Sequence, residues 1–163
     1  MNITFQHATS ADLDAIMPIE QAGFNADEAS SRNTMLDRIN NLSDTFIVAK
    51  ADGKVVGFIV GAAYNKRYLD DQLYEKATPN DPADAYQTVL SIAVAPDQQG
   101  HGIASQLLTH IETIAKRDHR KAVTLTCLQR LIPFYEKNGY VNEGESDSSH
   151  AGEVWYNMVK PLN

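Results

Sequence analysis

Two closely spaced glycines, Gly100 and Gly102, mark the stretch of this chain that is best suited to bind a ligand. They join an apolar run at residues 89–95, typical of a strand covered on both faces, to a helical pattern of apolar residues that starts at Ile103. Glycines at such a join let a ligand approach the backbone closely. The first amides of a helix have no internal partner and form the positive end of its dipole. The stretch therefore predicts an anion site, above all for phosphate.

The turn matches one of three phosphate-binding patterns. A nucleotide P-loop requires a lysine directly after its last glycine, whereas Ile103 follows Gly102. A dinucleotide-binding turn requires a third glycine, whereas Ser105 occupies that position. The third pattern, Q/R-x-x-G-x-G/A, binds pyrophosphate and is matched by residues 99–104, Gln-Gly-His-Gly-Ile-Ala.

A second motif lies downstream of the turn, with a predicted strand between them. Residues 133–140 read Pro-Phe-Tyr-Glu-Lys-Asn-Gly-Tyr. The two motifs together resemble the GNAT acetyltransferase superfamily, and the resemblance covers nearly the whole chain. Residues 127–135, Cys-Leu-Gln-Arg-Leu-Ile-Pro-Phe-Tyr, and residues 58–61, followed by a long charged loop, further resemble arylalkylamine (serotonin-type) N-acetyltransferases. The resemblance implies direct transfer of an acetyl group from acetyl-CoA to an amine, without a metal.

The resemblance also implies which residues act on acetyl-CoA. Main-chain groups of Ile92, Ala93 and Val94 would pair with the pantetheine arm in the manner of a strand. Tyr135 matches the family tyrosine that gives a proton to the departing thiolate, since a phenol with a pKa of about 10 is protonated at neutral pH. Backbone amides of the turn would hold the pyrophosphate without a lysine, and the turn consists of Gln99, Gly100, His101, Gly102, Ile103 and Ala104.

The base that must take a proton from the incoming amine is not identified by the resemblance. The serotonin-type enzymes carry two histidines on the fourth strand, where this chain has Thr88 and Leu90. Glu20 and Asp84 remain as candidates. Cys127 has no recognisable histidine partner, so we predict a structural role for it and no acetyl-cysteine intermediate.

None of the five histidines is assigned to this role by its position in the sequence. His101 occupies a variable position of the turn. His110 lies in the third predicted helix and His119 beyond its end, both expected at the surface. His7 and His150 have no predicted place.

The elements that position these residues alternate between strands and helices. Apolar patterns predict strands at residues 3–7, 45–50, 55–61, 88–95, 122–127, from 141, and 154–159. They predict helices from Ser10 to about 24, around 35–42, from 103 to 115, and over 130–138. Pro18 should kink or split the first helix. With the resemblance, the expected fold is an α/β single domain over residues 1–163. It has a mixed, mostly antiparallel sheet of about six to seven strands, helices on both faces, and splayed fourth and fifth strands.

Two connections bear on the acceptor side of the site. Residues 25–32 form a polar connection, and residues 65–87 form a long polar loop that we expect to cover the substrate. Phe24, Tyr64 and Tyr68 are candidate walls of a pocket for an aromatic amine.

The charge and cysteine content limit the partners and the compartment. A net charge of −7 argues against nucleic acid as the main partner, because phosphate backbones require a basic face. The single cysteine excludes an internal disulfide and fits a reducing compartment. The chain shows no signal peptide and no apolar segment long enough to span a bilayer, so we predict a cytoplasmic protein without a membrane partner. The resemblance allows a homodimer.

Three functions remain open from the sequence. The first is acetyl transfer to the primary amine of a small molecule, and the second is acetyl transfer to a protein or peptide amine. The third is an acyl-CoA-binding module without turnover. The presence of Tyr135 in its full motif favours an enzyme.

Overall fold

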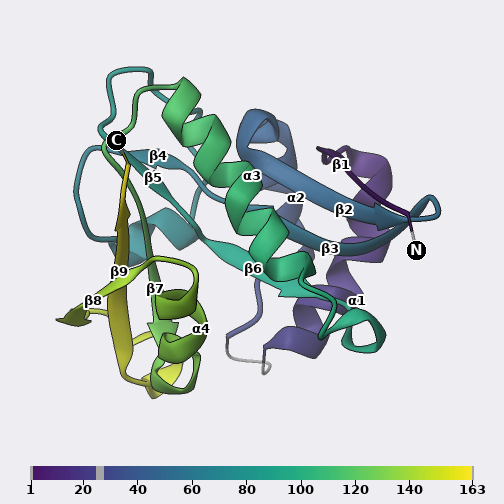
Figure 1. Cartoon of the computed structure of the whole chain (residues 1–163). Coiled ribbons are helices and arrows are strands. Elements are labelled where there is room, and N and C mark those ends of the chain that lie inside the picture. Colours follow the sequence, from purple (N-terminus) through teal and green to yellow (C-terminus); the bar gives the residue numbers. More distant parts are fainter. Residues whose placement is uncertain (1, 25–27, 163) are drawn as a thin grey trace.

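The computed structural model describes residues 2–24 and 28–162, and within them the chain forms nine strands and four α-helices (Figure 1). The strands are β1 (Ile3–His7), β2 (Phe46–Ala51), β3 (Lys54–Val60), β4 (Ala63–Tyr64), β5 (Tyr86–Thr88), β6 (Ser91–Val94), β7 (Ala122–Leu128), β8 (Val141–Glu145) and β9 (Trp155–Pro161). The helices are α1 (Leu13–Gly23), α2 (Arg32–Asn41), α3 (Ile103–Arg117) and α4 (Ile132–Lys137). Short 3-10 turns include η3 (Asp71–Tyr74), η4 (Pro96–Gln98), η5 (Gln129–Leu131) and η6 (His150–Gly152). Residues 25–27 of the predicted polar connection lie outside the described residues.

The strands form two sheets instead of one. Their orders are β1-β2-β3-β6 and β4-β5-β7-β9-β8. Every neighbouring pair is antiparallel except β5 and β7, which are parallel. The prediction of a mixed, mostly antiparallel arrangement is therefore confirmed. The number of strands is higher than predicted because β4 has only two residues and the strand predicted at 88–95 is divided into β5 and β6.

The division between β5 and β6 is a transfer of the chain from one sheet to the other. The amide of Val89 donates to Thr124 O on β7 at 3.0 Å, whereas the next amide, Leu90, donates to Val60 O on β3 at 2.8 Å. Beyond this point β6 pairs with β3 and β7 pairs with β9, so β6 and β7 diverge (Figure 1). The predicted splayed strands are confirmed.

Helices cover both faces of the first sheet, as predicted. Successive residues of β2 alternate in direction, since side chains along a strand point to opposite faces. Phe46 and Val48 belong to the core cluster beneath α1 and α2, whereas Ile47 and Ala49 belong to the cluster beneath α3. A strand that is buried on both faces explains the continuous apolar run in this part of the sequence.

The first helical segment differs from the prediction at its start and at its proline. The N-cap is Thr9, one residue before the predicted Ser10, and the amide of Thr9 donates to Asp12 Oδ2 at 2.9 Å. This contact is half of a capping box. Pro18 lies inside α1, which continues through it, so the predicted split does not occur.

No helix within residues 2–24 and 28–162 is long and apolar enough to cross a bilayer.

Candidate active site

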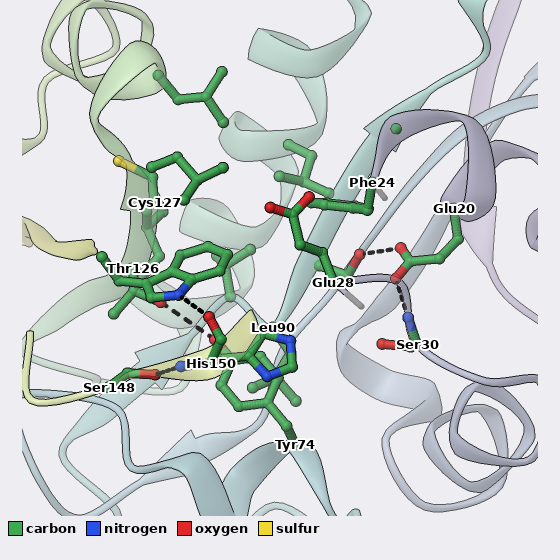
Figure 2. A pocket seen from close by; sticks show the side chains of 18 of the residues that line it. Glu20, Phe24, Glu28, Ser30, Tyr74, Leu90, Thr126, Cys127, Ser148 and His150 are labelled. Carbon is green, nitrogen blue, oxygen red and sulfur yellow. Dashed lines mark hydrogen bonds between the residues drawn. The ribbon is translucent and has the colours of Figure 1, made fainter. Parts of the chain in front are cut away.

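A pocket lies where β6 and β7 diverge. Its described lining comes from the end of α1 and the residues after it, η3, the β5–β6 junction with the start of β6, β7, η5, α4, the segment between β8 and β9, and the first residue of β9. Figure 2 shows residues from α1 and the following connection facing two residues of β7 across the pocket, with two aromatic rings at its lower edge. The residues that line it include Glu20, Phe24, Glu28, Ser30, Tyr74, Leu90, Ser91, Ile92, Thr126, Cys127, Arg130, Tyr135, Ser148, His150 and Trp155.

Tyr135 lines this pocket from α4. Pro133 stands in the first turn of the helix, where its missing N–H costs nothing, and Gly139 follows its end with a φ of 93°. The ring is buried and meets Phe134 and Tyr140 edge to face, with ring centroids 5.1 and 5.7 Å away. Burial raises the pKa of Tyr135, and the neighbouring thiol of Cys127 raises it further. The phenol is therefore protonated at neutral pH and able to donate a proton.

Cys127 is unsuited to act as a nucleophile. Burial raises the pKa of its thiol to about 12, so the thiolate is scarce at neutral pH. Only a thiolate attacks a thioester efficiently. The structure therefore supports the predicted structural role of Cys127.

The glycine turn presents free amides to open space. Gly100 and Gly102 have φ values of 84° and 78°, which favour glycine, and Gly102 is the N-cap of α3. Gln106 is the first residue whose amide bonds one helical turn back, to Gly102 O at 3.1 Å. The amides of the first turn of α3, at 103–105, precede that bond and have no helical partner. A Cβ on either glycine would meet no atom within 4 Å beyond its chain neighbours, so both glycines border open space.

The free edge of β6 offers main-chain groups at alternate residues. The amide of Ala95 donates to Val56 O at 2.7 Å, which fixes the phase of the antiparallel ladder with β3. In such a ladder every second residue bonds to the partner strand. The main chain of Ala93 is therefore directed toward β3, whereas Ile92 and Val94 direct their groups toward the gap. A ligand pairing with this edge would bond to those two residues and not to Ala93.

The predicted candidates for the base are placed very differently. Glu20 is buried in the pocket wall, and both carboxylate oxygens are occupied: Oε1 accepts from Ser91 Oγ at 2.5 Å and Oε2 from the amide of Ser30 at 2.7 Å. These bonds tie α1 to β6 and favour a positioning role for Glu20. Asp84 lies away from the pocket, next to Arg120, whose Nη1 donates to Asp84 O at 2.6 Å. It cannot reach an acceptor bound beside Tyr135.

The predicted aromatic walls are only partly correct. Phe24 lines the pocket, but Tyr64 and Tyr68 do not, because their hydroxyls donate to Asp70 and to Glu143. Sequence reasoning missed the aromatic residues that do line it with Phe24, and these are Tyr74, His150 and Trp155. They lie in η3, in η6 and at the start of β9, and the chain's single tryptophan was the one available signal.

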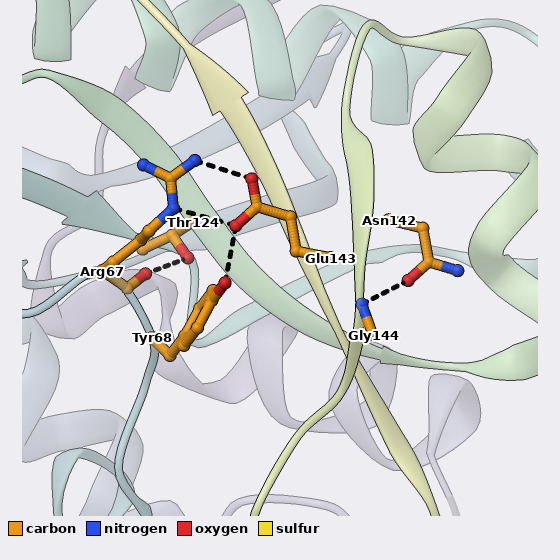
Figure 3. A network of polar contacts seen from close by, with 6 residues as sticks. All are labelled: Arg67, Tyr68, Thr124, Asn142, Glu143 and Gly144. Carbon is orange, nitrogen blue, oxygen red and sulfur yellow. Dashed lines mark hydrogen bonds and ion pairs between the residues drawn. The ribbon is translucent and has the colours of Figure 1, made fainter.

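The loop at 65–87 is anchored to the second sheet and does not cover the pocket as a whole. Arg67 Nε and Nη2 donate to the two oxygens of Glu143 at 2.8 and 2.6 Å, and Tyr68 Oη donates to Oε1 at 2.7 Å (Figure 3). Thr124 Oγ1 donates to Arg67 O at 2.6 Å. We predicted that this loop covers the substrate. Of residues 65–87, Tyr74 lines the pocket, and Arg67 and Tyr68 do not.

We expect Glu143→Gln to lower the free energy of unfolding by about 1 kcal/mol at pH 7, because the charged pair is partly exposed. The hydrogen bonds from Arg67, and then that from Tyr68, hold the pKa of Glu143 below its usual value. A carboxyl whose pKa is lower in the folded state stabilises the fold above its unfolded pKa, and this contribution is lost as the pH falls through the folded pKa. Urea unfolding at pH 7 and in the acid range measures the difference in unfolding free energy between the variant and wild type. This difference should become smaller as the pH falls. Glu145→Gln, an exposed change on the same strand, should show no such trend.

A sequence model described as the Acetyltransferase (GNAT) family matches residues 13–140. The chain therefore belongs to the GNAT family of N-acetyltransferases, enzymes that use acetyl-CoA.

Solved structures share the whole fold at low sequence identity. Ard1 from Thermoplasma volcanium is 20% identical, with a TM-score of 0.81, and the match covers 100% of this chain and 99% of that one. The ribosomal-protein-S18-alanine N-acetyltransferase from Escherichia coli is 19% identical, with a TM-score of 0.71 and coverages of 99% and 95%. The PaiA N-acetyltransferase from Thermoplasma acidophilum, solved in complex with coenzyme A, is 19% identical, with a TM-score of 0.73 and coverages of 99% and 100%.

Proposed function

We propose that the protein transfers an acetyl group from acetyl-CoA to the primary amine of a small molecule. The observation that carries the choice of a small acceptor is the closed aromatic end of the pocket. Ser148 Oγ donates to Asp71 Oδ1 at 2.7 Å, and the rings of Tyr74 and His150 stack with centroids 6.1 Å apart and planes inclined by 7°. These contacts join η3 to the β8–β9 segment across that end. A closed end suits a compact amine better than an extended polypeptide.

The residues of the gap fit acetyl-CoA on the donor side. The free amides at the start of α3, with the open space before Gly100 and Gly102, suit a pyrophosphate. The outward main-chain groups of Ile92 and Val94 suit the pantetheine amides. When bound, acetyl-CoA supplies an activated acetyl thioester, and no metal is required for an amine to attack it. The binding of acetyl-CoA by the full predicted set, residues 92–94 and 99–104, remains a proposal. Ala93 has the least support, because its main chain is directed toward β3.

Tyr135 is proposed as the acid. Its hydroxyl has no hydrogen-bond partner within residues 2–24 and 28–162, so its proton is available to the departing sulfur. The other buried tyrosine nearby, Tyr140, is not available, because its hydroxyl donates to Glu112 Oε2 at 3.0 Å. A cytoplasmic location and a homodimer stay predictions.

Thiol release from acetyl-CoA with a panel of amines tests this function. The panel holds arylalkylamines, polyamines, aminoglycosides and basic peptides, and the arylalkylamines come first because Phe24, Tyr74 and Trp155 line the acceptor end. Release with a small amine supports the proposal and gives the acceptor class. Release with peptides alone would replace it by protein or peptide acetylation. No release with any amine, despite binding of acetyl-CoA by calorimetry, would contradict it.

We expect Gly102→Leu to weaken acetyl-CoA binding by at least about tenfold, which corresponds to about 1.4 kcal/mol. The leucine would project from the turn to which we assign the pyrophosphate, and it would disturb a backbone that has a φ of 78°. Calorimetry with acetyl-CoA measures the effect. Gly144→Leu is the matched control, because Gly144 has a φ of 103° and the same open surroundings but lies on β8. Equal binding by both variants would refute the placement of the pyrophosphate.

A further inference from the structure

His150 is held at the acceptor end of the pocket by its neighbours. Its ring stacks on Tyr74 and lies 5.9 Å from the ring of Trp155, with the planes inclined by 44°. Its carbonyl accepts from Trp155 Nε1 at 2.9 Å, and its amide donates to Ser148 Oγ at 3.2 Å. Figure 2 shows the imidazole beside Tyr74 and Leu90 at the lower edge of the pocket. The position of this histidine is therefore fixed by both its ring and its main chain.

The backbone after His150 takes an uncommon path that keeps it there. Ala151 has a φ of 56° and Gly152 a φ of 69°, so two successive residues of η6 lie in the left-handed region. A non-glycine residue in that region costs on the order of 1 kcal/mol, so the surrounding contacts must hold it there. The path bends the segment so that Trp155, five residues later, reaches back to the carbonyl of His150.

The other proton acceptors of the pocket are already engaged. Both oxygens of Glu20 accept hydrogen bonds. Glu28 shares a hydrogen bond with Glu153, which raises the pKa of Glu153. The raised pKa of Cys127 keeps its thiol protonated. In the described part of the chain, the two ring nitrogens of His150 have no hydrogen-bond partner, so one of them is free to accept a proton.

We propose that His150 is the general base that takes a proton from the acceptor amine, an inference that rests on the proposed function. An amine arrives as an ammonium and must lose one proton before its nitrogen can attack. The attack forms the C–N bond and breaks the C–S bond of the thioester. His150 removes the first nitrogen proton and releases it to solvent. Tyr135 gives its proton to the departing sulfur and regains one from the nitrogen as the amide forms.

Charged groups of both signs surround His150. The titratable and charged groups that lie around the ring, from every packed segment, are Tyr74 and Asp71 of η3, Arg130 of η5, Glu28 after α1 and Glu153 after η6.

His150→Phe tests the inference because it keeps the stacking ring and removes both nitrogens. We expect kcat/KM for a basic amine at neutral pH to fall by roughly 10²-fold, with acetyl-CoA affinity unchanged and the histidine step of the acid limb lost from the pH profile. An electron-poor amine, which is neutral at pH 7 and needs no base, should be acetylated at nearly the same rate by both enzymes. His110→Phe is the matched control, since His110 is also exposed and stacks on an aromatic ring, Phe5, at 4.2 Å.

The outcomes separate the two proposals. A variant with kcat/KM for basic amines within about twofold of wild type would overturn the inference and leave His150 as an aromatic wall. An equal loss for basic and electron-poor amines would overturn it too, because the ring would then serve acceptor binding and not proton removal. No thiol release by the wild type with any amine would overturn the proposed function and this inference with it.

Discussion

Tyr135→Phe is expected to lower kcat by about 10³-fold, within the range that a positioned general acid contributes. The phenol is buried against Phe134 and Tyr140, and its raised pKa keeps the proton on the oxygen at neutral pH. The departing sulfur would receive this proton as the C–S bond breaks, so that free thiolate need not accumulate. The substitution removes the hydroxyl but keeps the ring and its edge-to-face contacts, so the free energy of unfolding and the Kd of acetyl-CoA should stay close to wild type. Steady-state kinetics, calorimetry and urea unfolding measure the three quantities.

Tyr140→Phe is the control with the opposite expected pattern. Its hydroxyl donates to Glu112, which also accepts from Lys160 Nζ at 2.8 Å, so its loss removes a buried bond to a charged group. Such a loss costs about 1.5–3 kcal/mol of stability. Tyr140 does not line the pocket, so kcat should be unaffected. An unchanged kcat in Tyr135→Phe, or a matching loss in Tyr140→Phe, would remove the role of Tyr135 as the acid.

The geometry of the glycine turn and of α4 was predictable because local sequence determines it. The glycines at 100 and 102 specify a left-handed turn, and the helix that follows supplies free amides without any distant partner. The α4 motif likewise carries its own start at Pro133 and its own end at Gly139. Tyr135 was identified through that motif, since nothing in its local pattern distinguishes a catalytic phenol from a packed one.

The acceptor side was not predictable, because it is assembled from segments without a periodic pattern. Tyr74 and His150 come from two short 3-10 turns and Trp155 from the first position of β9, and their meeting depends on the whole fold. The selection of Ile92 and Val94 over Ala93 depends on the phase of the ladder with β3, which a run of apolar residues cannot reveal. The prediction of a single strand at 88–95 was wrong for the same reason. Its residues are nearly all apolar, and only the partner strands show that the chain changes sheets at Val89.

Gly61→Ala is expected to lower the free energy of unfolding by at least about 3 kcal/mol, roughly 10 °C in Tm for a domain of this size. A Cβ at this position would lie 1.6 Å from Thr88 O and 2.6 Å from Thr88 C, distances that real Cβ atoms do not show. The obstructing atoms are backbone, so relief requires a movement of β5 relative to the end of β3. Gly61 is also bonded in place, since its carbonyl accepts from Thr45 Oγ1 at 2.5 Å and its amide donates to Thr45 O at 3.2 Å.

The same substitution tests whether the sheet change at Val89 and Leu90 creates the pocket. Thermal unfolding measures the loss of stability, and Gly23→Ala is the control, because its Cβ would meet Ala93 Cβ at an ordinary 3.5 Å. We expect Gly61→Ala to lower kcat/KM even well below its Tm, since any shift of Thr88 displaces the apex of the gap between β6 and β7. A variant with wild-type stability would show that the strands adjust easily. A destabilised variant with full activity at low temperature would show instead that the close approach at Gly61 holds the sheets together without setting the geometry of the site.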